Sequence, residues 1–294
     1  MKPTYKKIIK GFFFLFFLAL LVLLALYSIK LLQKDKLASE KEQEESYHLT
    51  SKETITMTPS PTVTPSPTPI PMLSSLDGYE AGDIVDSTLL DMSDLDLYFT
   101  SKAIDTTILD FISGKSYREN PDITLEDLTY LKLLHYNYNH EIQVGELLIN
   151  KQIATDCIEI FQELFKQQYE ISSMYLIDRY WMGDGSSTDT ASMSDNNSSG
   201  FCYRTIAGTS KLSNHALGFA IDINPYENPY ITYKNGVPVF YHENAENYAD
   251  RDLKLSHMID HDDLCYQLFT QHGFTWGGDW KNSKDYQHFE KKIQ

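Results

Sequence analysis

The chain has 294 residues, of which 42% are hydrophobic and 22% charged, and its formal net charge is −16. Residues 1–36 contain seven Lys and one Asp and so carry +6, which leaves −22 for the rest of the chain. A region as acidic as this repels polyphosphate, and no stripe of Lys and Arg interrupts it, so we expect no nucleic-acid partner.

The N-terminal region contains a long apolar run. Residues 11–29 carry no charge and, at 1.5 Å per residue, would span about 28 Å as a helix, close to the hydrocarbon thickness of a bilayer. Lysines precede the run, which favours a cytoplasmic N-terminus. A cleaved signal peptide is the alternative, but its apolar region is usually shorter and ends at a small-x-small site. We therefore predict that residues 1–36 form a cytoplasmic N-terminus and a single-pass signal anchor.

Residues 37–75 have the composition of a linker. Six of the eleven prolines lie between residues 59 and 71, interleaved with Thr and Ser. Such a segment buries too little apolar area to fold, and proline favours extended polyproline II. We predict a disordered Ser/Thr/Pro-rich spacer outside the cytoplasm, followed by a domain over residues 76–294 with its core at about 97–294.

The remaining sequence predicts one α+β domain. A capping-box pattern at residues 124–127 precedes Leu128, Leu131 and Leu134 at helical spacing, which indicates a helix. An apolar stripe from Ile153 to Phe165 predicts a second helix over residues 153–169. The other predicted elements are strands at 144–149, 174–177, 216–223, 274–276 and 286–289, a polar loop at 183–200, and a helix at 262–272 closed by Gly273.

The three cysteines, Cys157, Cys202 and Cys265, are too few for a disulfide scaffold, and their spacing fits no zinc finger. One disulfide would leave an odd thiol. We expect three unpaired thiols in the core.

Two segments near the C-terminus contain the residues of a metal site. His215, Asp222 and His288 would supply two imidazoles and one carboxylate, the number of protein ligands that a hydrolytic zinc uses while a fourth position stays open. Asp285 lies three residues before His288, where a carboxylate could serve as a general base without being a ligand. The same three ligands would also hold Mn²⁺ or Co²⁺.

Other motifs are incomplete. His140 and His242 are each followed by Glu, but neither continues as HExxH. Ser194-Asp195-Asn196 spells a motif of serine penicillin-binding enzymes, yet no Ser is followed three residues later by Lys and no KTG is present. The Asp-rich residues 184–195 lack EF-hand spacing, so a solvated loop is favoured over a calcium site.

Longer patterns resemble a known family. SxHxxGxAxD at residues 213–222 and DxxHF at 285–289, together with FCYR at 201–204, NPY at 228–230 and GFTWGGDW at 273–280, are similar to VanY-type zinc D-alanyl-D-alanine carboxypeptidases. These are related to D-Ala-D-Ala dipeptidases and to L-alanyl-D-glutamate endolysins. The resemblance implies a small α+β domain of the hedgehog/D,D-peptidase type, with an antiparallel sheet, flanking helices and one Zn²⁺.

The resemblance also implies roles for single residues. His215, Asp222 and His288 match the family's zinc ligands, and Asp285 matches its catalytic base. Arg204 matches the arginine that polarises the scissile carbonyl, and Ser213 occupies a substrate-binding position, although a turn cap is an equal alternative for this serine. Cys202 replaces the Asn more usual at this place.

The function implied is that of a membrane-anchored zinc metallopeptidase. It would hydrolyse D-alanyl-D-alanine ends of peptidoglycan stem peptides or precursors outside the cytoplasm. Two alternatives stay open: an endopeptidase that cuts L-alanyl-D-glutamate bonds, and a non-catalytic zinc-containing module for wall binding or signalling. The presence of Asp285 at the base position argues against the second.

Overall fold

The computed structural model describes residues 71–206, 209–242 and 245–292. The predicted anchor and most of the predicted linker lie outside these residues. Among the described residues, no helix combines the length and the apolar character needed to cross a bilayer.

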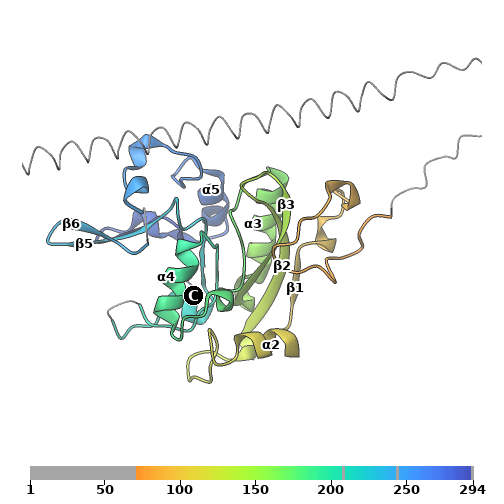
Figure 1. The fold of residues 1–294 in the computed structure, drawn as a ribbon, viewed down its shortest axis with the longest axis horizontal. Coiled ribbons are helices and arrows are strands. Elements are labelled where there is room, and N and C mark those ends of the chain that lie inside the picture. Colours follow the sequence, from red (N-terminus) through yellow and green to blue (C-terminus); the bar gives the residue numbers. More distant parts are fainter. Residues whose placement is uncertain (1–70, 207–208, 243–244, 293–294) are drawn as a thin grey trace, which may run out of the picture. The chain divides into compact units, whose positions relative to one another are not determined.

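The described residues contain four α-helices and nine strands in an α+β arrangement, as predicted (Figure 1). The helices are α2 (Thr106–Ile112), α3 (Ala154–Lys166), α4 (Gly185–Ser194) and α5 (Leu264–Gln271). The strands are β1 (Thr100–Lys102), β2 (Leu128–Tyr136), β3 (Ile142–Asn150), β4 (Ala220–Asp222), β5 (Tyr230–Lys234), β6 (Val237–Phe240), β7 (Thr275–Trp276), β8 (Lys284–Asp285) and β9 (His288–Glu290). Instead of one sheet, they form three antiparallel three-stranded sheets, ordered β1-β2-β3, β4-β9-β7 and β6-β5-β8.

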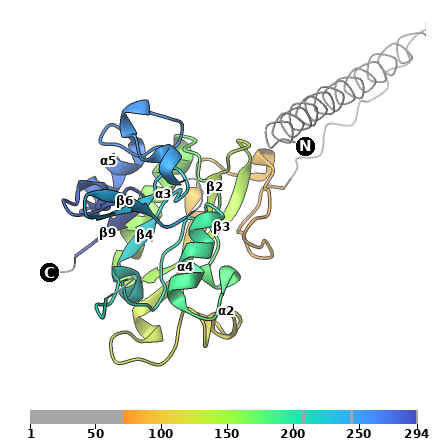
Figure 2. The same ribbon diagram turned by 60° about the vertical axis from the view of Figure 1, so that its left-hand side comes forward.

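The first sheet is built on a long hairpin. All nine residues of β2 pair with β3, and α3 packs against β2 (Figure 1). In both views α2 and α5 lie toward opposite ends of the described domain (Figure 2). The buried stripe of α3, which includes Ile160, Phe161 and Phe165, fills the main hydrophobic core. The prediction of this helix is confirmed, and it ends three residues earlier than predicted.

The predicted helix after residue 127 is wrong. The capping box forms, because the backbone N–H of Thr124 donates to the side chain of Asp127, but it closes a single 3₁₀ turn, and β2 follows. Leu131 and Leu133 face the main core, whereas Leu128 and Tyr130 face a second hydrophobic cluster. A strand buried on both faces has a continuous apolar run, in which helical spacing is also present by chance.

The predicted polar loop at 183–200 is also wrong, because it contains α4. Asp184 caps this helix by accepting from the backbone of Ser186 and Ser187. The hydroxyls of Thr188, Thr190 and Ser194 each donate to the carbonyl four residues earlier. These bonds satisfy the hydroxyl groups of residues that have low helix propensity. A segment with the polar composition of a loop therefore forms a helix.

The shorter predictions are partly confirmed. The strand at 144–149 and the helix at 262–272 form as β3 and α5, and Gly273 follows α5 with φ +82°. Residues 174–177 are mostly buried, but they make no strand: a 3₁₀ turn begins at Ile177. Residues 216–223 contain a 3₁₀ turn, Asn214–Leu217, before β4, and residues 286–289 enter a strand only at His288. All three cysteines are buried and unpaired, as expected.

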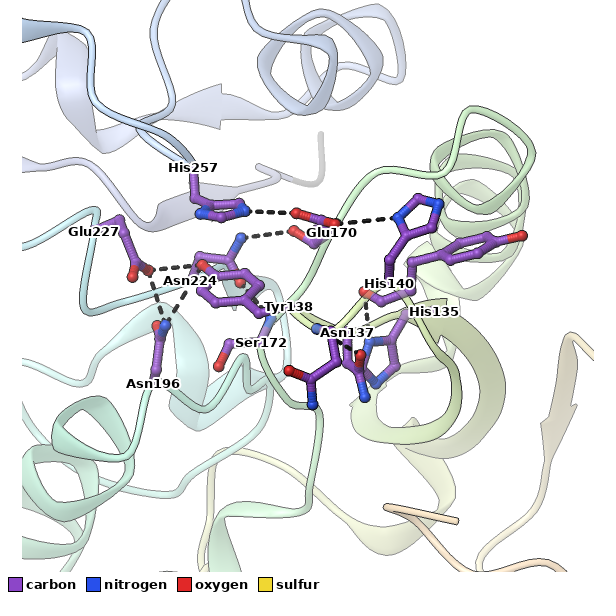
Figure 3. A network of polar contacts seen from close by, with 12 residues as sticks. His135, Asn137, Tyr138, His140, Glu170, Ser172, Asn196, Asn224, Glu227 and His257 are labelled. Atoms are coloured by element: carbon purple, nitrogen blue, oxygen red, sulfur yellow. Dashed lines mark hydrogen bonds and ion pairs between the residues drawn. The ribbon is translucent and has the colours of Figure 1, made fainter. Parts of the chain in front are cut away.

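A polar network holds three loops of the domain together (Figure 3). Glu170, which follows α3, lies between two imidazoles: its Oε1 is 3.2 Å from His140 Nδ1 and its Oε2 is 2.8 Å from His257 Nε2. Both histidines have positive φ, 60° and 64°, which is unfavourable for a residue with a Cβ. The hydrogen bonds to Glu170 help to hold both histidines in this backbone conformation.

The same network reaches the segments that carry the site described below. Tyr138 and Asn196 both donate to Glu227 at 2.8 Å, and Asn224 donates to the carbonyl of Glu170 at 3.0 Å (Figure 3). Asn196 lies two residues beyond α4, and Asn224 lies two residues beyond β4. The network therefore fixes where both elements end.

Replacing Glu170 by Gln is expected to cost about 1 kcal/mol of stability at about pH 6, because two charge-assisted bonds are lost. The His257 hydrogen bond is the main cause that lowers the pKa of Glu170 below its usual range. A carboxylate whose pKa is lower in the folded state stabilises the folded protein at pH values above its unfolded-state pKa. This stabilisation is lost as the pH falls through the folded-state pKa.

Thermal unfolding of both proteins at several pH values tests this expectation. The difference between wild type and Glu170→Gln should shrink as the pH falls below about 4. Glu163→Gln serves as the control, because among the described residues the Glu163 side chain forms an i,i+3 contact of 3.7 Å with Lys166 and a bond to Gln167, and no contact with a histidine. A difference that is constant with pH would contradict the assigned cause.

Candidate metal centre

The first residue of the candidate centre, His215, lies in the 3₁₀ turn before β4. Ser213 begins this turn by accepting from the backbone N–H of His215 at 3.3 Å. Gly218 ends it with φ +71°, and a Cβ at this position would lie 2.5 Å from the backbone nitrogen of Asn150. Only glycine fits such a left-handed position against a neighbouring strand. The turn directs the buried His215 ring toward β9.

Asp222 and His288 are direct partners across β4 and β9. His215 Nε2 is 3.2 Å from Asp222 Oδ2 and 3.1 Å from His288 Nδ1, and His288 Nδ1 is 3.1 Å from Asp222 Oδ1. One ligand atom from each residue lies within 4.8 Å of the others, and all three residues are buried. The strand pair thus brings together Asp222 and His288, which are 66 positions apart in sequence.

These contacts determine the protonation of the cluster when no metal is bound. Burial alone would raise the pKa of Asp222, but the two imidazoles outweigh it and hold that pKa below its usual range. Burial alone would lower the pKa of His288, but hydrogen bonds to Asp222 and Glu290 raise it. Because metal ligands must be deprotonated, we expect metal binding to release a proton here.

Asp285 lies beside the cluster but on another sheet. It is in β8, whose partner is β5, and Tyr230 is directly opposite it. Its Oδ1 is buried and has no hydrogen-bond partner among the described residues. Burial is the main reason that the pKa of Asp285 is raised above its usual range. A buried carboxylate oxygen without a donor requires a ligand or a water molecule to bond with it.

The residues present fit a divalent metal ion. Two imidazoles and one carboxylate suit zinc, and the three ligands leave room for a fourth. Asp285 lies outside the ligand cluster, which among the described residues consists of His215, Asp222 and His288. The unpartnered oxygen of Asp285 instead fits the position of a proton acceptor next to the metal.

Arg204 faces the same pocket and is held by α4. Its Nη2 is 2.8 Å from Asp189 Oδ2, and both side chains are largely buried. Burial alone would lower the pKa of Arg204, but Asp189 raises it. The Nε of Arg204 has no partner among the described residues, so it retains a donor. Asp189 was not predicted from the sequence, because its role depends on its contact with Arg204.

One pocket of about 210 Å³ brings these groups together. Its walls include three aromatic residues, Tyr230, Tyr241 and Trp280; the two tyrosine rings stack at 4.9 Å, and Trp280 lies 5.2 Å from the His288 ring. All six residues predicted to act in the site line it: Arg204, Ser213, His215, Asp222, Asp285 and His288. Cys202 is buried next to it, and its backbone N–H donates to the carbonyl of His215.

Together, the α+β fold and the buried His-Asp-His group with its adjacent carboxylate have the features of a metallopeptidase. Residues 207–291 match the family model of D-alanyl-D-alanine carboxypeptidase, and this match confirms the resemblance to the VanY-type family. The matched segment contains the three candidate ligands and Asp285, whereas Asp189 and Arg204 precede it. No curated protein and no solved structure matched the chain.

Proposed function

We propose that the protein is a zinc-dependent peptidase that removes the terminal D-alanine from peptidoglycan stem peptides. The observation that carries this proposal is the buried His215–Asp222–His288 cluster with the unpartnered carboxylate oxygen of Asp285 in one pocket. The family match adds the class of substrate. We also propose that the apolar run at residues 11–29 anchors the chain in the membrane and that the proline-rich segment holds the peptidase outside the cytoplasm.

Each residue has a separate task in this reaction. When bound, a zinc ion polarises the peptide carbonyl and acidifies the attacking water. Asp285 accepts the proton of that water and delivers it to the nitrogen of the leaving D-alanine. Arg204, kept in place by Asp189, donates to the carbonyl oxygen as negative charge develops on it. Trp280 and the two tyrosines form walls around the peptide.

One observation favours the second candidate, an endopeptidase. Arg204 is the only Lys or Arg among the described residues that line the pocket, and Asp189 already neutralises it. The same lining includes four carboxylates, those of Asp189, Asp222, Asp285 and Glu290. Among the described side chains, a free terminal carboxylate would therefore meet no unpaired cation, whereas a bond inside a peptide needs none.

Mass spectrometry of a muramyl-type pentapeptide incubated with the full chain in detergent distinguishes these functions. Loss of one terminal alanine supports the carboxypeptidase, and cleavage after L-alanine establishes the endopeptidase. Either activity should disappear with a chelator and return when zinc is added. Unchanged peptide beside a protein that binds one zinc per chain would contradict both and favour a non-catalytic module.

A further inference from the structure

His288 uses both of its ring nitrogens. Its Nδ1 faces Asp222 and His215, and its Nε2 lies 3.2 Å from Oε2 of Glu290. The side chain of Glu290 is only 13% exposed. Because the two nitrogens lie at different corners of one rigid ring, Glu290 cannot join the cluster that Nδ1 faces. Glu290 contacts the His288 ring at Nε2, the nitrogen that does not face the cluster.

The strand pairing explains why Glu290 is in this place. In β9, residues two apart point to the same face, so His288 and Glu290 share the pocket side. The residue opposite Glu290 on β4 is Ala220, whose small side chain leaves space for the carboxylate. Asn214 donates through its Nδ2 to the same Oε2 of Glu290. This asparagine directly precedes His215, so one turn supplies both a candidate ligand and a clamp on Glu290.

The other histidine is oriented differently. His215 faces the cluster through Nε2, and its Nδ1 is 2.6 Å from the carbonyl oxygen of Gly200. That acceptor is neutral, whereas Glu290 is a carboxylate. A histidine can bind a metal through one nitrogen only if the other one carries the proton, and the acceptor of that proton selects the tautomer. An anionic acceptor also increases the electron density that the ring offers to the metal.

We propose that Glu290, clamped by Asn214, is a positioning residue that holds His288 in the Nε2–H tautomer and strengthens its bond to the metal through Nδ1. This role rests on the metal site of the proposed function. Neither Glu290 nor Asn214 belongs to the ligand set or to the proton-transfer group. They act on the metal only through His288.

Zinc affinity of the full chain, measured by competition with a chromophoric chelator, tests this role without a substrate. Glu290→Gln keeps an acceptor for both hydrogen bonds but removes the negative charge, so zinc should bind about 10–100-fold more weakly. Glu290→Asp, which restores the charge on a shorter side chain, should recover part of the loss. Glu119→Gln, an exposed glutamate with the same change of charge, is the matched control and should bind zinc as the wild type does.

A purely structural role would not change the tautomer of His288. Long-range ¹H–¹⁵N spectra of the histidine side chains report that tautomer directly. With zinc loaded into both proteins, we expect His288 of the wild type to carry its proton only on Nε2, and we expect Glu290→Ala to show a second population with the proton on Nδ1. Unchanged zinc affinity in Glu290→Gln, or an equal loss in Glu119→Gln, would overturn the proposal whether or not the wild type cleaves peptides.

Discussion

Replacing Asp285 by Asn is expected to lower kcat by about 10²–10⁴-fold while zinc binds as in the wild type. Asparagine has nearly the same shape, so the close packing of Gly277 against the backbone and Cβ of Asp285 is preserved. Its amide cannot accept a proton from water. Asp222 and His288 are on the sheet of β4 and β9 and His215 is in the turn before β4, whereas Asp285 is on β8, so the ligands keep their positions.

Steady-state kinetics and chelator competition on the same preparations check this expectation. Asp279→Asn is the matched control, because Asp279 is half exposed and pairs with His261 at the surface. We expect the control to keep the wild-type kcat. An Asp285→Asn protein with undiminished kcat would show that another group accepts the proton and would remove the main argument for the proposed mechanism.

Replacing Arg204 by Lys is expected to reduce kcat by about 10²–10³-fold, close to the effect of removing a donor to a developing oxyanion. Lysine keeps the positive charge that Asp189 needs, so a buried charge is not left alone. It lacks the planar fork that lets one guanidinium bond to Asp189 and to a substrate oxygen at the same time. The loss should therefore appear in kcat more than in thermal stability.

Asp189→Asn separates positioning from direct contact. Arg204 keeps all its donors in this variant but loses its ionic partner on α4, so we expect a smaller fall in kcat than in Arg204→Lys. Unfolding temperatures of both variants show whether the pocket is intact. Wild-type kcat in Arg204→Lys would mean that the guanidinium does not touch the reacting carbonyl.

The candidate centre could be predicted from the sequence because its residues lie in short, local patterns. His215 lies in a short turn and Asp222 in the strand that follows it, and Asp285 and His288 are three residues apart. Because imidazole and carboxylate groups are metal ligands, such patterns predict a metal site. That β4 and β9 pair in register to bring Asp222 opposite His288 was not readable from spacing, since a strand pairing is decided by the whole fold.

The wrong predictions of secondary structure and the residues that were not predicted have a common physical origin. Leu128, Leu131 and Leu134 have the spacing of a helix face, but β2 is buried on both sides and tertiary packing overrides the local pattern. In α4, hydroxyl side chains bond back to the helix, so a composition typical of loops is compatible with a helix. Asp189 and Glu290 were missed because each acts through one neighbour, Arg204 or His288, which only the three-dimensional structure reveals.

Two of the ligands and the base lie on different sheets. Metal binding and proton transfer can therefore be lost independently of each other. The register of β8 against β5 alone decides that Asp285, not Lys284, points into the pocket. A slip of one residue there would leave the metal cage complete, yet it would present an ammonium group where the proton acceptor belongs. Metal content is therefore an incomplete measure of active enzyme, and damage to the exposed β5–β6 hairpin would yield fully loaded but inert molecules.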